Sequence, residues 1–567
     1  MPETSPHTLL SAPEAPSGVL PAVPRLPTGV PGLDTLLAGG LPAGRLYVLA
    51  GEPGAGKTIL AHQMGAQVVA HGGMVLFLTV HTEAHHTLLA QARTLAFFDP
   101  AIVAAEQFRY VSLSAALDEG GIAAVRERLA HLVQTYAPTL LVLDGLHMLK
   151  LLGTAVGTEA GTDERAFQRF MIFLQAQATL SGITTLALTN YDGAAPADAM
   201  YAVPDGIVHL RTVRYGMREV RRLAVSKLRG SASLAGWHDY TLGAGGMRVF
   251  PRLEARIQAE RLPRRQPSTL RAAFGVAGLD ALLGGGVPEA SVTLLAGAPG
   301  AGKTLMGLAF LVEGARRGER GLYLGFRETA DRIVAKADGV GLAVGAMREA
   351  GLLDVEWAAP LELFIDALTE QLLRAVFDAP AVPSREPDQH PTAPRDAGPP
   401  EGALARFRPT AEPGGRAPTR APVRRVFLDG LDDLRRTCLE ADRLPSVLAA
   451  LTDVLRAGGV SLLLSQEFRQ PFGADLTLPV EEMAAAVDNI VLLRYREDGH
   501  RLRRLISVLK LREHAYRADI RAFSITGEGI HVDGTPRDGD VLGDDIAEDG
   551  ITRDAGGPLA PSGPRSA

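Results

Sequence analysis

Continuous apolar runs recur along the first half of the chain, and stretches with helical spacing separate them. The apolar runs are Leu46–Ala50, Met74–Val80, Phe108–Leu113, Thr139–Asp144 and Gly182–Asn190. Helices are predicted between them at Ile59–Ala70 and Ile122–Tyr136. Runs that are apolar without alternation indicate strands buried on both faces. The pattern therefore predicts an α/β fold with a mostly parallel sheet and helices on both faces.

The second half of the chain repeats this order. The segment Thr28–Pro42 returns as Phe274–Pro288, and the two copies keep the same offset as Lys57 and Lys303. A repeat of this length indicates a duplicated domain rather than a solenoid unit. We predict one domain at residues 25–260, a linker at 261–271 and a second domain at 272–532, with a basic connector that begins near Pro251.

Three stretches have no apolar periodicity and are predicted to be disordered. Residues 1–24 are rich in proline, serine and alanine, and residues 533–567 are acidic and rich in glycine. The third, residues 379–422, is rich in proline and forms an insertion within the second domain.

The bulk composition is that of an ordinary soluble protein, with 46% apolar and 22% charged residues. A net charge of −6 argues against non-specific binding to nucleic acid or membranes. The single cysteine, Cys438, excludes an intramolecular disulfide and fits a reducing compartment. No apolar stretch is long enough to span a membrane, and no signal peptide is evident. A cytoplasmic globular protein is expected.

One octapeptide occurs twice, at Gly51–Thr58 and Gly297–Thr304, and fits the pattern G-x-x-x-x-G-K-[ST] of a phosphate-binding loop. In such a loop the backbone N–H groups surround the phosphates, the lysine reaches the β- and γ-phosphates, and the hydroxyl binds Mg²⁺. The predicted ATP-binding residues are Gly51, Gly54, Gly56, Lys57, Thr58, Gly297, Gly300, Gly302, Lys303 and Thr304. Each copy follows a predicted strand and precedes a predicted helix, so the sequence predicts two ATP sites.

Two aspartates end apolar runs and complete the predicted metal sites. Asp144 ends the run that begins at Thr139, and Asp429 ends Val426–Asp429. A carboxylate at this place holds Mg²⁺, together with Thr58 in the first site and Thr304 in the second. Since the carboxyl ends of parallel strands meet at one edge of a sheet, we expect each aspartate to lie near its phosphate loop.

The lead-in segments, the two loop and aspartate pairs, and two K-x-R strands resemble the KaiC-like branch of the RecA-type ATPases over residues 25–260 and 268–532. The resemblance implies two tandem RecA-like P-loop NTPase domains that hydrolyse ATP. It also implies a ring, in this family a hexamer, with ATP between neighbouring subunits. Family members carry catalytic carboxylates after the second strand, and a K-x-R pair from the adjacent subunit reaches the γ-phosphate.

Carried over to this chain, the trans-acting cations are Lys227 and Arg229 in the first domain and Lys510 and Arg512 in the second. A cation aimed at the γ-phosphate stabilises the charge that develops in phosphoryl transfer. The alternative interpretation of each K-x-R pair is a solvated strand face.

The sequence departs from the family where two adjacent glutamates follow the second strand. The second half has Arg327-Glu328, and the first half has His81-Thr82 with Glu83 one residue later. We predict that Glu328 polarises the attacking water in the second site. Glu83 serves in the first site only if the loop bulges by one residue. The alternative for both glutamates is a charge at a helix N-terminus, favoured by the helix dipole.

The histidines near Glu83, which are His81, His85 and His86, have no accompanying cysteine or acidic cluster, so a polar loop is favoured over a metal site.

A second departure concerns phosphorylation. Autophosphorylating relatives carry a Ser-Thr pair just before the aspartate that opens a late strand. The corresponding segments here, Met200–Asp205 and Met483–Asp488, contain no serine or threonine, and Tyr201 is the nearest hydroxyl. This counts against self-phosphorylation, although serine/threonine kinase activity on a partner stays open.

The predicted function is that of a signalling or regulatory ATPase that acts on an unidentified protein partner. One alternative is a KaiC-type serine/threonine protein kinase, and another is a scaffold whose sites bind ATP without turnover. A RecA-like DNA-binding ATPase is the last alternative. The segments Asn190–Asp205 and Pro471–Asp488 contain no lysine or arginine, so nucleic acid is not the expected partner.

Overall fold

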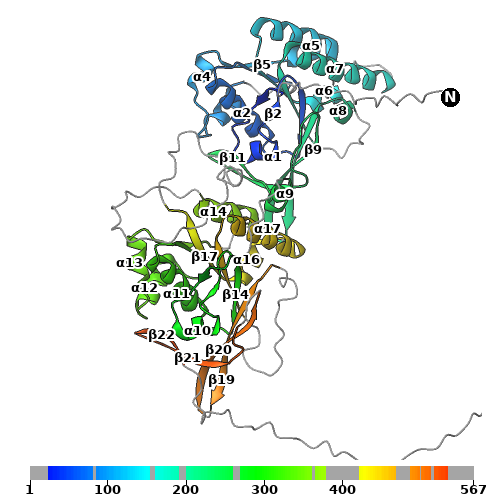
Figure 1. Ribbon diagram of the computed structural model, residues 1–567. Helices are drawn as coiled ribbons and strands as arrows, with labels where there is room; N and C mark the ends of the chain where they lie inside the picture. Colours follow the sequence, from blue (N-terminus) through cyan, green and yellow to red (C-terminus); the bar gives the residue numbers. More distant parts are fainter. Residues whose placement is uncertain are drawn as a thin grey trace, which may run out of the picture.

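The computed structural model describes residues 23–80, 85–152, 160–190, 199–259, 268–359, 364–377, 421–467, 486–498, 500–512 and 516–533. Within these residues the chain forms two large sheets, each covered by helices on both faces (Figure 1). The predicted α/β fold is confirmed. The segments predicted to be disordered, 1–24, 379–422 and 533–567, lie almost wholly outside the described residues, as does most of the predicted linker 261–271.

The first sheet has the strand order β11-β10-β9-β8-β3-β7-β6-β4-β5. Its parallel strands are β3 (Leu46–Gly51), β4 (Val75–Thr79), β5 (Phe108–Ser112), β6 (Leu140–Asp144), β7 (Thr184–Asn190) and β8 (Gly206–Tyr215). Three antiparallel strands extend it, β9 (Arg218–Leu228), β10 (His238–Gly243) and β11 (Gly246–Phe250). The last two have no counterpart among the predicted strands, because they are short and mix polar with apolar residues.

Helices cover both faces of the first sheet. One face carries α1 (Leu33–Leu36), α2 (Lys57–Ala70), α3 (His85–Ala92) and α4 (Ala101–Ala104). The other carries α5 (Ser114–Tyr136), α6 (Leu146–Leu152), α7 (Ala160–Ser181) and α8 (Ala199–Ala202). Helix α5 begins earlier than the predicted Ile122, with a break at Gly120 and Gly121 whose backbone angles are not helical. A small hairpin of β1 (Arg25–Leu26) and β2 (Leu41–Pro42) precedes the sheet.

The second sheet repeats the first strand for strand, in the order β16-β15-β17-β18-β14-β19-β20-β21-β22. The parallel strands are β14 (Val292–Gly297), β15 (Arg320–Gly325), β16 (Leu353–Trp357), β17 (Val423–Asp429), β18 (Ser461–Glu467) and β19 (Asn489–Asp498). The antiparallel strands are β20 (Arg501–Leu511), β21 (Arg521–Thr526) and β22 (Gly529–Val532). The matching order confirms that the fold is duplicated.

The helices of the second half also lie on two faces. One face carries α10 (Ala277–Leu282), α11 (Lys303–Arg316), α12 (Ala330–Asp338) and α13 (Val344–Glu349). The other carries α14 (Ile365–Phe377), α16 (Leu431–Thr437) and α17 (Leu444–Ala457), with a 3₁₀ turn at Ala441–Arg443. A hairpin of β12 (Arg271–Ala272) and β13 (Val287–Pro288) matches the hairpin at the start of the first half.

The connector between the halves is helical at its start. Helix α9 (Leu253–Ala259) lies beside α17, and its Leu253 is buried in the core of the second sheet (Figure 1). Leu253 and Ile257 are four residues apart, so both side chains lie on one helix face and pack against that core. The predicted connector from Pro251 is thus partly a structural element of the second half.

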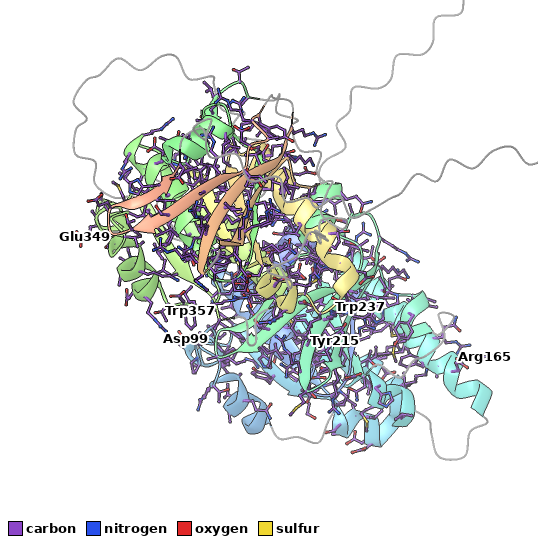
Figure 2. The ribbon with its side chains drawn as sticks, turned by 90° about the horizontal axis from the view of Figure 1, so that it is seen from below. Asp99, Arg165, Tyr215, Trp237, Glu349 and Trp357 are labelled. Atoms are coloured by element: carbon purple, nitrogen blue, oxygen red, sulfur yellow. The ribbon has the colours of Figure 1, made fainter. Side chains whose placement is uncertain are left out.

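Polar contacts also join the two halves at the turn after α16. The Tyr215 hydroxyl donates to Glu440 Oε1 at 2.6 Å, and the buried Arg222 guanidinium pairs with the same carboxylate. Arg443 donates to Glu254 Oε1 at 2.6 Å. In Figure 2, Tyr215 lies among the strands of the first half on the side where the helices of the second half approach. The junction combines an apolar helix contact with ion pairs.

Candidate functional site

The second phosphate loop connects β14 to α11. Gly300 and Gly302 have backbone φ angles of 73° and 106°, a conformation that favours glycine. A Cβ atom on Gly302 would lie 2.7 Å from Ile525 Cδ1, so a larger residue would displace the Ile525 side chain. The Lys303 ammonium donates to the carbonyl oxygens of Gly297 and Ala298, both at 2.9 Å. The loop therefore closes around its own lysine.

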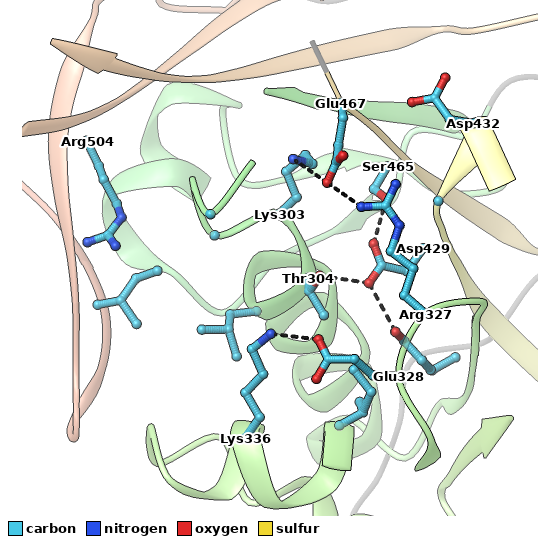
Figure 3. Close-up of a pocket in the computed structure, with 17 residues that line it drawn as sticks. Lys303, Thr304, Arg327, Glu328, Lys336, Asp429, Asp432, Ser465, Glu467 and Arg504 are labelled. Carbon is cyan, nitrogen blue, oxygen red and sulfur yellow. Dashed lines mark hydrogen bonds and ion pairs between the residues drawn. The ribbon is translucent and has the colours of Figure 1, made fainter. Parts of the chain in front are cut away.

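Asp429 ends β17 beside this loop, and three hydroxyl groups hold its carboxylate (Figure 3). Thr304 Oγ1 and the Tyr323 hydroxyl donate to Oδ2 at 2.7 and 3.0 Å. Ser465 Oγ donates to Oδ1 at 2.6 Å. Burial and the nearby Asp429 carboxylate raise the pKa of the Tyr323 hydroxyl, so it stays protonated as a donor. The geometry brings the predicted Thr304 and Asp429 together.

Tyr323 and Ser465 were not among the predicted site residues. What would identify them is the register of the sheet: Ser465, on strand β18, pairs with Asp429 on the neighbouring strand β17. Register between strands far apart in the chain is not visible in a single sequence.

Arg327 links two acidic groups beside the loop. Its Nε donates to Asp433 Oδ2 at 2.7 Å, and its Nη1 donates to Glu467 Oε1 at 2.8 Å. Glu467 Oε1 also lies 3.9 Å from Lys303 Nζ. Although burial opposes the shift, the hydrogen bonds to Glu467 and Asp433 raise the pKa of the Arg327 guanidinium. Burial lowers the pKa of the Lys303 ammonium, and Glu467 opposes that shift.

Glu328, the predicted catalytic glutamate, lines the same cavity. Its Oε1 accepts a hydrogen bond from Lys336 Nζ of helix α12 at 3.0 Å. Figure 3 shows this pair on the side of Thr304 away from Glu467. The cavity has a volume of about 400 Å³. Its charged lining residues are Lys303, Arg327, Glu328, Lys336, Asp429, Asp432, Glu467 and Arg504.

The first phosphate loop, between β3 and α2, has the same shape. Lys57 Nζ donates to Gly51 O at 2.7 Å and to Asn190 Oδ1 at 3.2 Å. Thr58 Oγ1 donates to Asp144 Oδ2 at 3.2 Å, which brings together the predicted metal-binding pair. Burial lowers the pKa of the Lys57 ammonium, with Asp144 opposing the shift.

Gly54 and Gly56, with φ angles of 80° and 92°, give the first loop the same backbone conformation as the second.

Three positions around the loops differ between the halves. Strand register matches Tyr323 with Phe77, Ser465 with Leu188, and Glu467 with Asn190. The first site therefore lacks both hydroxyl donors and the carboxylate at these positions.

Glu83 and His81 lie outside the described residues, as do the side chains of His85 and His86. The prediction that Glu83 acts in the first site therefore stays a prediction.

The predicted trans-acting cations lie at the end of each sheet where the parallel strands begin. The phosphate loop of the same half lies at the other end, where these strands finish. Lys227 is paired with Ile207 on β8, whereas Gly51 of the loop is paired with Leu210, nearer the carboxyl end of that strand. Within one chain the structure does not bring these cations to the loop of their own half.

These cations also make contacts at that end of the sheet. Lys227 Nζ donates to Ala202 O at 2.8 Å, and Lys510 Nζ donates to Val487 O at 2.7 Å. Arg229 lies 3.7 Å from Asp205, and Arg512 lies 3.3 Å from Asp488.

The residues present fit a nucleotide with a bound Mg²⁺. Both loops have left-handed glycines, and an added Cβ would meet Leu242 at Gly56 and Ile525 at Gly302. Both lysines point back into the loop. The hydroxyl and carboxylate oxygens of Thr304 and Asp429 are the hard donors that Mg²⁺ prefers. Among the described helices, none is long and apolar enough to cross a lipid bilayer.

Comparison with known proteins gives a family match over both halves. The family model described as the KaiC ATPase matches residues 26–254, 272–365 and 416–537. The chain is similar to the circadian clock oscillator protein KaiC of Picosynechococcus sp., with 25% identity over 414 residues, covering 72% of this chain and 69% of that protein. The KaiC protein of Rippkaea orientalis is 26% identical over 411 residues, with 72% and 68% covered. The circadian clock oscillator protein KaiC 1 of Synechocystis sp. is 24% identical over 411 residues, with the same coverage.

Proposed function

This chain belongs to the KaiC family of ATPases, and from that membership we propose that it binds ATP with Mg²⁺ at two sites and hydrolyses it mainly at the second. The observation that carries the proposal is the pairing of a phosphate-loop lysine with a threonine–aspartate pair in both halves. The difference between the sites supports the unequal turnover, since Phe77 and Leu188 of the first half stand where the second has the hydroxyl donors Tyr323 and Ser465.

The residues of the second site have distinct roles in this proposal. Lys303 and the loop amides bind the β- and γ-phosphates, while Thr304 and Asp429 hold Mg²⁺. When bound, Mg²⁺ neutralises charge on the phosphate oxygens. Tyr323 and Ser465 fix the orientation of the Asp429 carboxylate. Glu328 lines the cavity as one carboxylate near the site of water attack.

We propose that the chain assembles into a ring with ATP between neighbouring subunits. Lys227 and Arg229 of one subunit would complete the first site of the next, and Lys510 and Arg512 would complete the second. Their position at the edge of the sheet opposite their own loop supports this, because a contact with a phosphate then needs another copy of the chain. A hexamer is the size that the family resemblance implies.

Protein kinase activity and DNA binding are not part of this proposal. Tyr201, the nearest hydroxyl to the family's phosphorylation positions, is only 9% exposed. No observation on the described residues favours nucleic acid. We propose instead a cytoplasmic regulatory role in which the nucleotide state of the ring controls binding of a protein partner.

The proposal is tested by purifying the full-length protein, measuring ADP formation, and measuring its mass in solution by light scattering with and without ATP and Mg²⁺. We expect Mg²⁺-dependent ADP formation and a larger assembly with ATP. A protein that forms no ADP contradicts the enzymatic part. A protein that stays monomeric with ATP contradicts the trans-acting role of the K-x-R pairs.

A further inference from the structure

We propose that Glu467 is a further catalytic residue of the second site, where its carboxylate takes a proton from the water that attacks the γ-phosphate. The inference rests on the ATP hydrolysis proposed above and names a residue that the family resemblance does not. The predicted glutamates follow the strand equivalent to β15, whereas Glu467 ends β18.

The position of Glu467 follows from the parallel sheet. Strand β18 lies beside β14, and Glu467 pairs in register with Gly297, where the phosphate loop begins. Its Oε1 lies 3.9 Å from Lys303 Nζ, and its side chain, 31% exposed, lines the cavity. Since the lysine of such a loop reaches the β- and γ-phosphates, a carboxylate at this distance lies next to the γ-phosphate.

Arg327 offsets the repulsion between the Glu467 carboxylate and a bound phosphate. It pairs with Glu467 at 2.8 Å and is itself anchored at 2.7 Å by Asp433, whose side chain is 3% exposed. The guanidinium offsets the charge of Glu467 and holds it in one orientation, as a planar group with several donors does well. Arg327 occupies the first position of the family's glutamate pair. This chain therefore has a cation at that position, and the acid that faces it, Glu467, stands at the end of strand β18.

The contacts of the two cavity glutamates differ. Glu328 pairs with Lys336, and among the described residues no ion pair joins it to Lys303. The contacts of Glu467 with Arg327 and Lys303 both involve Oε1. The other oxygen, Oε2, forms no hydrogen bond or ion pair with the described residues, so it can accept the proton. Glu467 is therefore better placed than Glu328 to act on water at the γ-phosphate.

The first site provides a natural comparison. Asn190 occupies the position of Glu467, and its amide oxygen accepts a hydrogen bond from Lys57 at 3.2 Å. An amide can orient a lysine or a water molecule, but it does not take up a proton near neutral pH. At this position the second site therefore has a group that can act as a general base, and the first site does not.

The hydrolysis needs no reactant other than ATP and water. The water oxygen bonds to the γ-phosphorus while the bond between that phosphorus and the β–γ bridging oxygen breaks. One water proton passes to the Glu467 carboxylate and then to solvent, and the products are ADP and inorganic phosphate. Lys303 and the loop amides stabilise charge on the phosphate oxygens during the step.

The test compares Glu467→Gln with Glu328→Gln and with Glu349→Gln, all in the full-length protein. Glu349 is exposed, lies outside the cavity and serves as the matched charge control (Figure 2). Four quantities are measured: kcat for ATP, KM for ATP, ATP affinity by calorimetry, and the ratio of ATP to ADP that stays bound after free nucleotide is removed. Glu467→Asp, which keeps the charge, guards against a folding defect.

For Glu467→Gln we expect a kcat about 100-fold lower, in the range of general-base effects, with ATP affinity within about threefold of wild type. The variant should retain ATP rather than ADP. Glu467→Asp should recover part of kcat, and Glu328→Gln should lose less of kcat than Glu467→Gln. A Glu467→Gln protein that binds ATP and keeps more than half of the wild-type kcat overturns the inference alone. A wild-type protein that makes no ADP overturns the proposed function and the inference together.

Discussion

The hydroxyl groups around Asp429 give the sharpest prediction about the second site. We expect Tyr323→Phe and Ser465→Ala to raise the Mg²⁺ concentration needed for half-maximal ATP turnover. Both changes remove a donor that the first site also lacks, since Phe77 and Leu188 occupy the matching positions. The variants therefore bring the metal site of the second half closer to that of the first.

The magnitude follows from the hydrogen bonds that each variant removes. Tyr323→Phe removes the bond of 3.0 Å to Oδ2, and Ser465→Ala removes the bond of 2.6 Å to Oδ1. A hydrogen bond to a charged group contributes about 1.5–3 kcal/mol. Loss of an outer partner of a metal ligand typically costs about 10- to 100-fold in metal affinity. We expect about a tenfold shift for Tyr323→Phe and a larger one for Ser465→Ala, whose bond is shorter.

The assay titrates Mg²⁺ against ATP turnover at a fixed, saturating ATP concentration. Tyr516→Phe is the control, because its hydroxyl donates to Leu509 O at 3.0 Å on an exposed part of the chain, away from the cavity. The double variant should show a larger shift than either single change. If both single variants need the same Mg²⁺ concentration as the control within twofold, the hydroxyls do not hold the metal carboxylate and the reasoning is wrong.

Two further predictions concern stability. Glu440→Gln should lower the free energy of unfolding by about 1–3 kcal/mol in thermal or urea unfolding, because Arg222 and Tyr215 lose a charged partner at the junction. The same stability as Glu349→Gln would contradict this. Burial lowers the pKa of His62 from 6.5 to about 4, so His62 takes up a proton at a higher pH in the unfolded chain than in the folded chain. The contribution of neutral His62 to the free energy of unfolding is complete above about pH 6.5 and is lost as pH falls towards 4. Between pH 7 and 5 the loss is about 2 kcal/mol. This part of the pH dependence should be absent in His62→Phe, and an unchanged slope argues against a neutral buried histidine.

The sequence predicted those features that are local or that repeat. Each phosphate loop lies within eight adjacent residues, and Asp429 ends an apolar run, so pattern alone placed both on the same edge of the sheet. The duplication was visible because the same lead-in occurs twice with one offset. Strand bounds such as β7 (Thr184–Asn190) differ from the predicted run by only two residues.

Features that depend on pairing between distant residues were not predictable. Arg327 and Glu467 are 140 positions apart, and Arg222 and Glu440 are 218 apart, so neither pair leaves a local pattern. The placement of α9 in the second core is of the same kind, because the sequence indicated only a basic connector from Pro251 and not what it packs against. The catalytic assignment was affected most, since Glu328 matched a family motif while Glu467 needed the strand order.

The central claim is that the two ATP sites are unequal, and the most direct measurement compares Lys303→Ala with Lys57→Ala in ATP turnover and in nucleotide bound per chain. Each variant should lose one bound nucleotide. We expect Lys303→Ala to lose at least nine-tenths of the turnover, while Lys57→Ala keeps more than half and mainly weakens assembly. Equal loss of turnover in the two variants would contradict the claim.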